Sequence, residues 1–228
     1  MVFFPPPSLD NEWDSEEEDG IADQHPLDVC CVPVNSFQLV VSSLPGRRCA
    51  GIRRSLVADI GTLRKAGVQD VFVLCTEAEL RRCHVPTLPV DYLEHGLVPH
   101  HHPLDDDHLS LSLTLPLLQE LHSVLLAGRQ TAIHCTDGLG HSCLMVVLLA
   151  MLLDSDLPPM VAMEIVQRAR GPAAIQTIKQ YNFAMDFRKN LSECDASSSP
   201  GNPSSSHLNL PSSALPVSSS ASTAAVFS

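Results

Sequence analysis

Basic residues are absent from the start of this 228-residue chain, where no Lys or Arg precedes Arg47. Nine of the 26 acidic residues lie between Asp10 and Asp28 and account for most of the formal net charge of −12. Between residues 29 and 191, 14 basic and 15 acidic residues nearly balance. Acidic runs are usually solvated, so residues 1–28 are predicted to be a disordered arm, with partner binding as the open alternative. A basic surface for nucleic acid is missing, so no nucleic-acid partner is expected.

Long apolar runs and paired cysteines are also missing. The longest apolar run covers 11 residues, 143–153, whereas a membrane-spanning helix needs about 20. The run is expected to form a buried helix, without membrane association. The eight cysteines include no C-x-x-C pair, and residues 1–7 do not resemble a secretion signal. Reduced thiols and a cytoplasmic or nuclear location are therefore expected, without a zinc site.

The middle of the chain alternates between strand and helix patterns. Residues 192–228, dominated by Ser, Ala and Pro, are predicted to be a disordered tail, which leaves a domain at 29–191. Alternation of this kind predicts an α/β fold with a mostly parallel central sheet and helices on both faces. Pro116 is expected to begin or kink its helix. Strands are predicted at 37–41, 71–75, 97–101 and 131–134, and helices at 53–66, 109–126, 142–153, 159–168 and 175–190.

The segment between the last predicted strand and the 142–153 helix has the pattern of a phosphate-binding loop. It reads His134-Cys135-Thr136-Asp137-Gly138-Leu139-Gly140-His141-Ser142. Ligands of parallel sheets bind at the carboxyl ends of strands, where Cys135 stands. Backbone N–H groups of a glycine-containing loop at a helix N-terminus can surround a phosphate and favour the thiolate form of Cys135. The thiolate would attack phosphorus and form a phosphocysteine intermediate.

Protonation of the leaving oxygen requires a general acid from a neighbouring loop. The segment 100–107 carries Asp105, Asp106 and Asp107, and the residue pattern leaves open which of them acts. The preceding triplet, 100–102, consists of histidines, but no suitably spaced carboxylate or cysteine completes a metal site. No metal and no other cofactor is therefore expected.

Several separated segments give the chain a wider resemblance. Residues 67–76, 100–104 and 174–182, together with the loop, resemble the kinase-associated phosphatase family (cyclin-dependent kinase inhibitor 3), a dual-specificity branch of the protein tyrosine phosphatases. The resemblance implies a monomeric, metal-free hydrolase that removes phosphate from threonine, serine or tyrosine of a phosphorylated cyclin-dependent kinase. By position it implies Cys135 as nucleophile, Asp106 as general acid and residues 136–141 as the phosphate-binding loop.

Supporting residues are expected on both sides of the loop. His134 is expected to order the loop through backbone contacts, and Ser142 to donate a hydrogen bond to the departing thiolate. Gln176 or Gln180 is expected to position the hydrolytic water, with helix capping and packing as the alternative.

Two residues depart from the family pattern. Asp137 adds a negative charge where the family has a small residue, and His141 stands where the family has arginine. Arginine holds two phosphate oxygens through a planar, permanently charged fork, which histidine does not provide. Two hypotheses follow: a protein phosphatase with reduced turnover, or a pseudophosphatase that binds the kinase without turnover.

Overall fold

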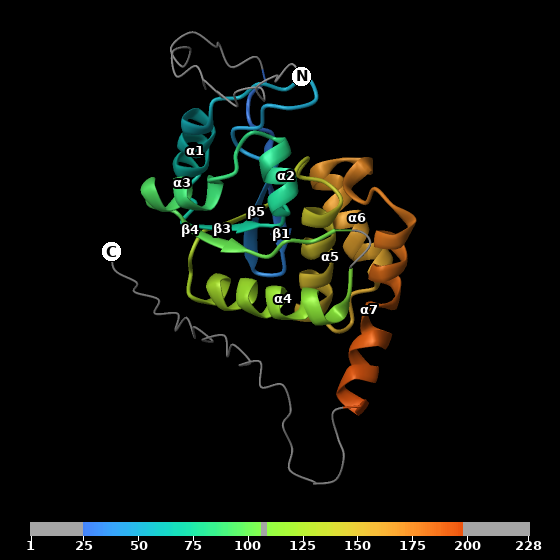
Figure 1. Cartoon of the computed structure of the whole chain (residues 1–228). Helices are drawn as coiled ribbons and strands as arrows, with labels where there is room; N and C mark the ends of the chain where they lie inside the picture. The colour runs from blue at the N-terminus through green and yellow to red at the C-terminus, as the bar shows by residue number, and fades with distance from the viewer. Residues whose placement is uncertain (1–24, 106–108, 198–228) are drawn as a thin grey trace, which may run out of the picture.

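The computed structural model describes residues 25–105 and 109–197, which form a five-stranded sheet covered by helices (Figure 1). The strands follow the order β1-β2-β5-β3-β4 across the sheet. Every neighbouring pair is parallel except β1 and β2. The mostly parallel sheet of the prediction is therefore confirmed, with one antiparallel edge. The strands are β1 (Val29–Val34), β2 (Phe37–Ser42), β3 (Asp70–Val73), β4 (Val98–His101) and β5 (Thr131–His134).

Two hydrophobic clusters cover the two faces of the sheet because successive strand side chains point to opposite sides. In β3, Phe72 belongs to one cluster, whereas Val71 and Val73 belong to the other. The first cluster packs against α4 (Leu111–Leu126), α5 (His141–Leu153), α6 (Pro159–Arg170) and α7 (Ile178–Ser197). The second packs against α1 (Leu56–Lys65), α2 (Glu77–Arg82) and α3 (Leu88–Glu94). Helices on both faces are therefore confirmed.

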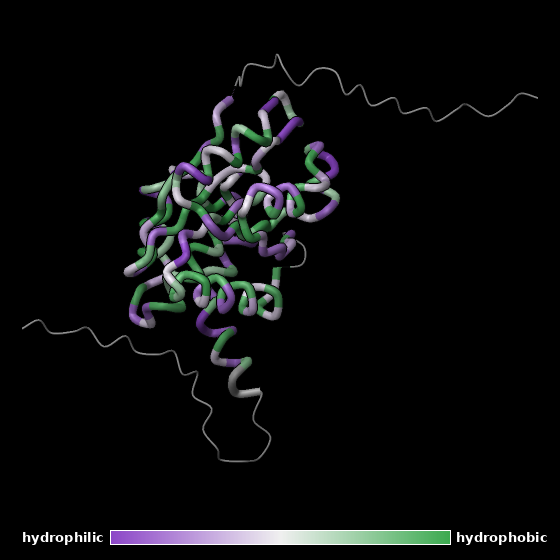
Figure 2. The backbone as a smooth tube through the Cα atoms, turned by 90° about the vertical axis from the view of Figure 1, so that its left-hand side faces the viewer, coloured by the Kyte–Doolittle hydropathy of each residue, from purple (hydrophilic) through white to green (hydrophobic). Residues whose placement is uncertain are grey.

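Helix α5 is the central helix of the larger layer. Ten of its residues, from Ser142 to Met151, are buried. Its surroundings are β1, β2, α4, α6 and α7, and Figure 2 shows the hydrophobic segments gathered inside the body of the molecule. The short apolar run therefore forms the buried helix that the sequence predicts. Within the described ranges, no helix has the length and apolar character needed to cross a membrane.

Several element boundaries differ from the prediction. Helix α4 begins at Leu111 and continues through Pro116, so the proline does not start the helix. Helix α7 continues to Ser197, past residue 191 where the folded domain was predicted to end. Strand β1, helices α2 and α3 and the short 3-10 helix η1 (Pro172–Ala174) were not predicted. A capping box at Thr76 and Glu79 starts α2 and is a local signal that would have indicated it.

Candidate active site

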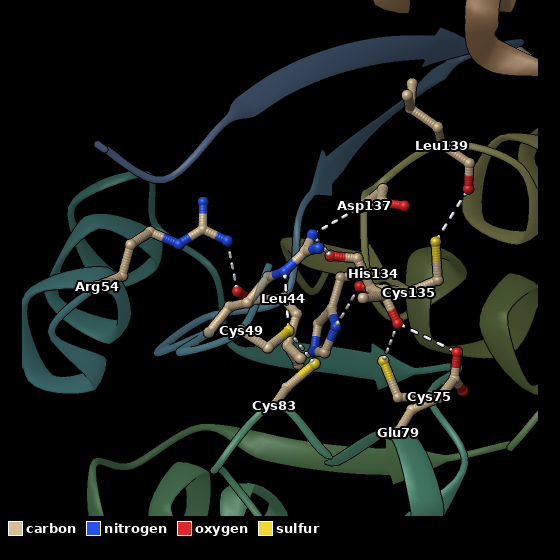
Figure 3. Close-up of polar contacts among 12 residues, drawn as sticks. Leu44, Cys49, Arg54, Cys75, Glu79, Cys83, His134, Cys135, Asp137 and Leu139 are labelled. Atoms are coloured by element: carbon tan, nitrogen blue, oxygen red, sulfur yellow. Dashed lines mark hydrogen bonds and ion pairs between the residues drawn. The ribbon is translucent and has the colours of Figure 1, made fainter. Parts of the chain in front are cut away.

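The predicted nucleophile, Cys135, directly follows β5 and lies in the loop that leads into α5 (Figure 3). Its side chain is only 8% exposed. Its Sγ donates a hydrogen bond to the backbone carbonyl of Leu139, at 2.9 Å. A carbonyl oxygen accepts from a thiol and repels a thiolate. In this loop conformation, therefore, the carbonyl of Leu139 faces the position that a bound phosphate would approach.

The N–H group of the Leu139–Gly140 peptide also forms a hydrogen bond. The N–H of Gly140 donates to the carbonyl of Ala174, at 2.9 Å, and Gly140 adopts φ +52°. A methyl group on Gly140 would lie 2.5 Å from Oε1 of Gln176, so this predicted supporting residue lies against the loop. The Leu139–Gly140 peptide must rotate before its N–H can face a phosphate at Cys135.

The other loop glycine, Gly138, lets two backbone segments approach closely. It adopts φ +67°, and an added Cβ would lie 2.4 Å from the carbonyl oxygen of Ser42, at the end of β2. The neighbouring β2 and β5 continue their contact beyond the sheet, since the N–H of Leu44 donates to the carbonyl of Thr136, at 3.1 Å. Glycine is required at 138 for both space and backbone conformation.

The substitution Gly138→Ala is expected to lower the free energy of unfolding by about 3 kcal/mol or more, because the methyl group meets backbone as well as a positive φ. Gly128→Ala is the matched control, since Gly128 has φ +73° but nothing within 4 Å of an added Cβ. The control should lose only about 1 to 2 kcal/mol. Urea unfolding of both variants checks this. Equal losses would show that the contact with Ser42 is unimportant.

The negative charge of Asp137 is paired with an arginine that the sequence reading missed. Arg47, on the turn after β2, forms an ion pair with Oδ1 of Asp137, and its Nη1 lies 3.4 Å from the carbonyl of Thr136. Burial opposes the charge of Arg47, but the contact with Asp137 raises the pKa of the guanidinium above its ordinary value. Asp137 is therefore held outward, with its side chain 51% exposed. Arg47 follows β2 and the loop follows β5, and these two strands are parallel neighbours. Their common position at the carboxyl ends of the strands is the signal that could have predicted the contact.

A second missed arginine, Arg170 of α6, holds the loop from the other side. Its Nε donates to the carbonyl of Gly138, at 2.9 Å, and its Nη1 to Asp28, at 2.7 Å. The thiol of Cys143 also donates to the carbonyl of Gly138, at 3.6 Å. These two donors fix the orientation of the Gly138 carbonyl.

The side chain of Thr136 is fixed by the start of α2. Its Oγ1 donates to Oε1 of Glu79, at 3.1 Å, while the other carboxylate oxygen of Glu79 accepts from the N–H of Thr76, at 2.8 Å. Residues Arg47, Arg170 and Glu79 thus fix successive parts of the loop from three segments that are distant in sequence.

The predicted supporting residue His134 is fully buried below the loop. Its Nδ1 lies 3.4 Å from the carbonyl of Cys135, which can only accept, so Nδ1 carries the proton. Its Nε2 then accepts from the hydroxyl of Tyr92, at 2.9 Å. Burial lowers the pKa of His134 from the ordinary 6.5 to about 4. His134 therefore contacts the backbone of the loop, and its role in ordering the loop stays a prediction.

The depressed pKa of His134 predicts a specific loss of stability in acid. The unfolded chain takes up a proton below pH 6.5, whereas the folded protein resists protonation until about pH 4. Stability is therefore present above pH 6.5 and falls by about 3 kcal/mol between these values. Urea unfolding at several pH values should show this step, and His134→Gln should reduce it. If His134→Gln lost the same stability over this pH range, the loss would arise from other groups.

The remaining predicted site residues differ in burial and in contacts. Asp106 and Asp107 lie outside the described residues, and Asp105 is exposed after the buried Leu104. His141 is half-buried and is the first residue of α5. The hydroxyl of Ser142 is buried and has no hydrogen-bond partner among the described residues. Gln180 is buried and accepts from the N–H of Gln176, at 3.0 Å, as capping requires.

The histidine triplet does not build a metal site. His100, in β4, and His102, just after its end, stack on Phe72 and bind the two carboxylate oxygens of Glu120, each at 2.7 Å. His100 also contacts Asp70, at 2.9 Å. Partial burial opposes the charge of Glu120, but the hydrogen bonds from both histidines lower the pKa of Glu120 below its ordinary value. Within residues 25–105 and 109–197, no cluster of three or more possible ligands is arranged for a metal ion.

Solved structures identify the class of this fold. Kinase-associated phosphatase with its catalytic-site cysteine substituted by serine has a TM-score of 0.71 and 36% sequence identity, and the match covers 74% of this chain and 98% of that chain. Tk-PTP in its active form has a TM-score of 0.56 and 24% identity, with coverage of 72% and 97%, and shows the fold alone. The fold is that of the protein tyrosine and dual-specificity phosphatases.

Sequence comparison specifies the family within that class. The family model of cyclin-dependent kinase inhibitor 3 (CDKN3) matches residues 3–163. The proteins of that name from Sus scrofa and Homo sapiens are 38% and 37% identical over 194 residues, which cover 82% of this chain and 92% of each relative. The chain belongs to the cyclin-dependent kinase inhibitor 3 family, and the resemblance noted in the sequence is confirmed.

Proposed function

We propose that this protein removes phosphate from threonine, serine or tyrosine of a phosphorylated cyclin-dependent kinase through a phosphocysteine on Cys135. The observation that carries the proposal is the position of Cys135 between β5 and the N-terminus of α5, in a loop with two glycines of positive φ. The solved relative named for kinase association has a catalytic-site cysteine, and its fold covers most of this chain. The family name supports a cyclin-dependent kinase as partner.

The proposed reaction has two steps. In the first, the thiolate of Cys135 attacks phosphorus, and Asp106 protonates the oxygen of the leaving side chain. In the second, a water molecule held near Gln176 gives a proton to the Asp106 carboxylate and attacks the phosphocysteine, the P–S bond breaks, and the buried hydroxyl of Ser142 donates to the departing thiolate. The unpartnered state of that hydroxyl among the described residues supports this role. The chemistry uses no metal.

Phosphate binding in this proposal includes a rearrangement of the loop. The backbone from Thr136 to His141 surrounds the phosphate, and the Leu139–Gly140 peptide turns so that its N–H replaces its carbonyl beside Cys135. Glycine at 140 permits both orientations without a Cβ clash. The N-terminal end of α5 contributes its dipole to the bound anion.

A pseudophosphatase that binds the kinase without turnover is the second candidate. Two observations favour it: His141 replaces the arginine of the family pattern, and the Leu139 carbonyl faces Cys135. Binding of a kinase does not require the loop arginine, so this candidate keeps the same partner.

One experiment separates the two candidates. The purified full chain is mixed with a cyclin-dependent kinase phosphorylated on its activation-segment threonine, and both phosphate release and complex formation are measured. Release with a phosphocysteine trapped at Cys135 by acid quench supports the enzyme. Complex formation without release supports the pseudophosphatase. Absence of both contradicts the choice of partner.

A further inference from the structure

Two cysteines outside the candidate active site lie close enough to react with each other. The Sγ atoms of Cys49 and Cys83 are 3.0 Å apart (Figure 3). Cys49 lies on the segment after β2, and Cys83 caps the C-terminus of α2. The N–H of Arg48 donates to the carbonyl of Cys83, at 3.0 Å, so the backbone holds the two segments together. A disulfide bond of about 2 Å needs only a small further approach of the sulfurs.

The two thiols have different surroundings. Cys49 is half-buried, and Nε of Arg47 donates to its Sγ, at 3.4 Å. Partial burial opposes ionisation, but hydrogen bonds from Cys83 and Arg47 and the charge of Arg47 lower the pKa of Cys49 below its ordinary value. Cys83 is buried, and burial together with the Cys49 contact raises its pKa to about 11. Cys49 thus has the character of a reactive thiolate, and Cys83 of a thiol that donates to it.

Other buried thiols in or near the candidate active site lack this arrangement. Burial and the nearby Cys135 raise the pKa of Cys75 far above its ordinary value. The thiol of Cys135 itself donates to a backbone carbonyl. Within the described residues, the contact of Cys49 with both a guanidinium and a second thiol therefore distinguishes this pair.

We propose that Cys49 and Cys83 form a modification site for hydrogen peroxide and small organic hydroperoxides, with Cys49 as the attacking thiolate and Cys83 as the resolving thiol. The Cys49 sulfur attacks one peroxide oxygen, the O–O bond breaks, and Cys49 becomes a sulfenic acid. The other oxygen leaves as hydroxide, or as alkoxide from an organic hydroperoxide, and takes a proton. The Cys83 sulfur then attacks the sulfenic sulfur, the S–S bond forms, and the S–O bond breaks to release water. Two thiols lose two electrons; hydrogen peroxide becomes two waters, and an organic hydroperoxide becomes one water and one alcohol.

The site is connected to the phosphate-binding loop through Arg47. The same guanidinium contacts Cys49, Asp137 and the carbonyl of Thr136. Formation of the disulfide removes the anionic acceptor at Cys49, which leaves Asp137 as the charged partner of Arg47. The oxidation site is therefore adjacent to the candidate active site but contains none of its predicted residues.

Peptide mapping of the reduced full chain after treatment with hydrogen peroxide tests the proposal without any phosphatase assay. Free thiols are blocked, and the joined peptides are identified by mass spectrometry. The Cys49–Cys83 disulfide should form before any other pair. A first disulfide that contains Cys135, Cys75 or Cys143 would overturn the proposal.

Variants of the pair distinguish the two roles. Cys83→Ala should leave Cys49 as a sulfenic acid that dimedone traps. Its rate of formation should be lower than in the unaltered protein, because the hydrogen bond from Cys83 that favours the Cys49 thiolate is lost. Cys49→Ser should slow oxidation of Cys83 at least about tenfold, because only a small fraction of Cys83 is thiolate. The exposed Cys31→Ser serves as control and should not change the disulfide. Equal oxidation of Cys83 with and without Cys49 would contradict the assignment.

Discussion

Replacement of Cys135 by serine is expected to reduce phosphate release from an aryl phosphate and from a phosphorylated kinase by at least about 10³-fold. A serine hydroxyl is a weak nucleophile at its free pKa. Removal of an enzyme's nucleophile leaves only the rate that binding and electrostatic stabilisation supply. The acid-quenched protein should then contain no phosphocysteine, and mass spectrometry of the loop peptide checks this directly.

Binding should survive that substitution. Serine is close to cysteine in size, and the contacts of Arg47, Arg170 and Glu79 with the loop do not involve the sulfur. Complex formation with the phosphorylated kinase is therefore expected to stay within about threefold of the unaltered protein. The exposed Cys31→Ser is the control for loss of a thiol and should keep the full rate. Retention of more than a tenth of the rate by Cys135→Ser would exclude the phosphocysteine mechanism.

The sequence predicted the elements that local pattern determines. Strand β5 runs from Thr131 to His134 as expected, and the loop and α5 follow it directly. A continuous apolar strand, a glycine-containing turn and an apolar helix give this order without reference to the remainder of the chain. The position of Cys135 at the carboxyl end of a parallel strand followed from the same pattern.

Contacts between segments that are distant in the sequence could not be predicted from local patterns. Arg47 contacts a residue 90 positions away, and Arg170 contacts a carbonyl 32 positions away. Neither arginine has a local pattern that marks it, because a basic residue on a turn or a helix end is usually solvated. The sequence indicated the added negative charge of Asp137 but not the arginine, Arg47, that pairs with it.

The orientation of the Leu139–Gly140 peptide also could not be predicted from the sequence. Glycine at 140 was recognised as a sign of close backbone approach, but glycine accepts either orientation of the preceding peptide. The structure has the carbonyl of Leu139 toward Cys135, because the N–H of Gly140 is held by Ala174. The choice depends on η1, a short helix that was not predicted, although the Gln176–Gln180 segment that follows it was expected near the loop.

The substitution His141→Arg is expected to raise the rate of phosphate release at least tenfold, and up to about 10²–10³-fold, because one oriented donor to the transition state contributes about that much. Position 141 begins α5 directly after Gly140, so an arginine there starts at the helix end that faces the predicted phosphate position. Its planar fork can bind two equatorial oxygens and stays charged at every working pH. Histidine offers one directed N–H and is only partly charged near neutrality.

The effect should appear in turnover, because the fork grips the oxygens more strongly as charge develops on them in the transition state. Steady-state kinetics on an aryl phosphate are therefore expected to show a larger change in kcat than in KM. His25→Arg, at an exposed position before β1, adds the same charge without adding a donor at the loop and should leave both constants unchanged. An increase below tenfold would mean that His141 does not limit the rate. If the unaltered protein already turned over as fast as the arginine variant, the imidazole would be a sufficient phosphate ligand in this loop, and the pseudophosphatase candidate would lose its main support.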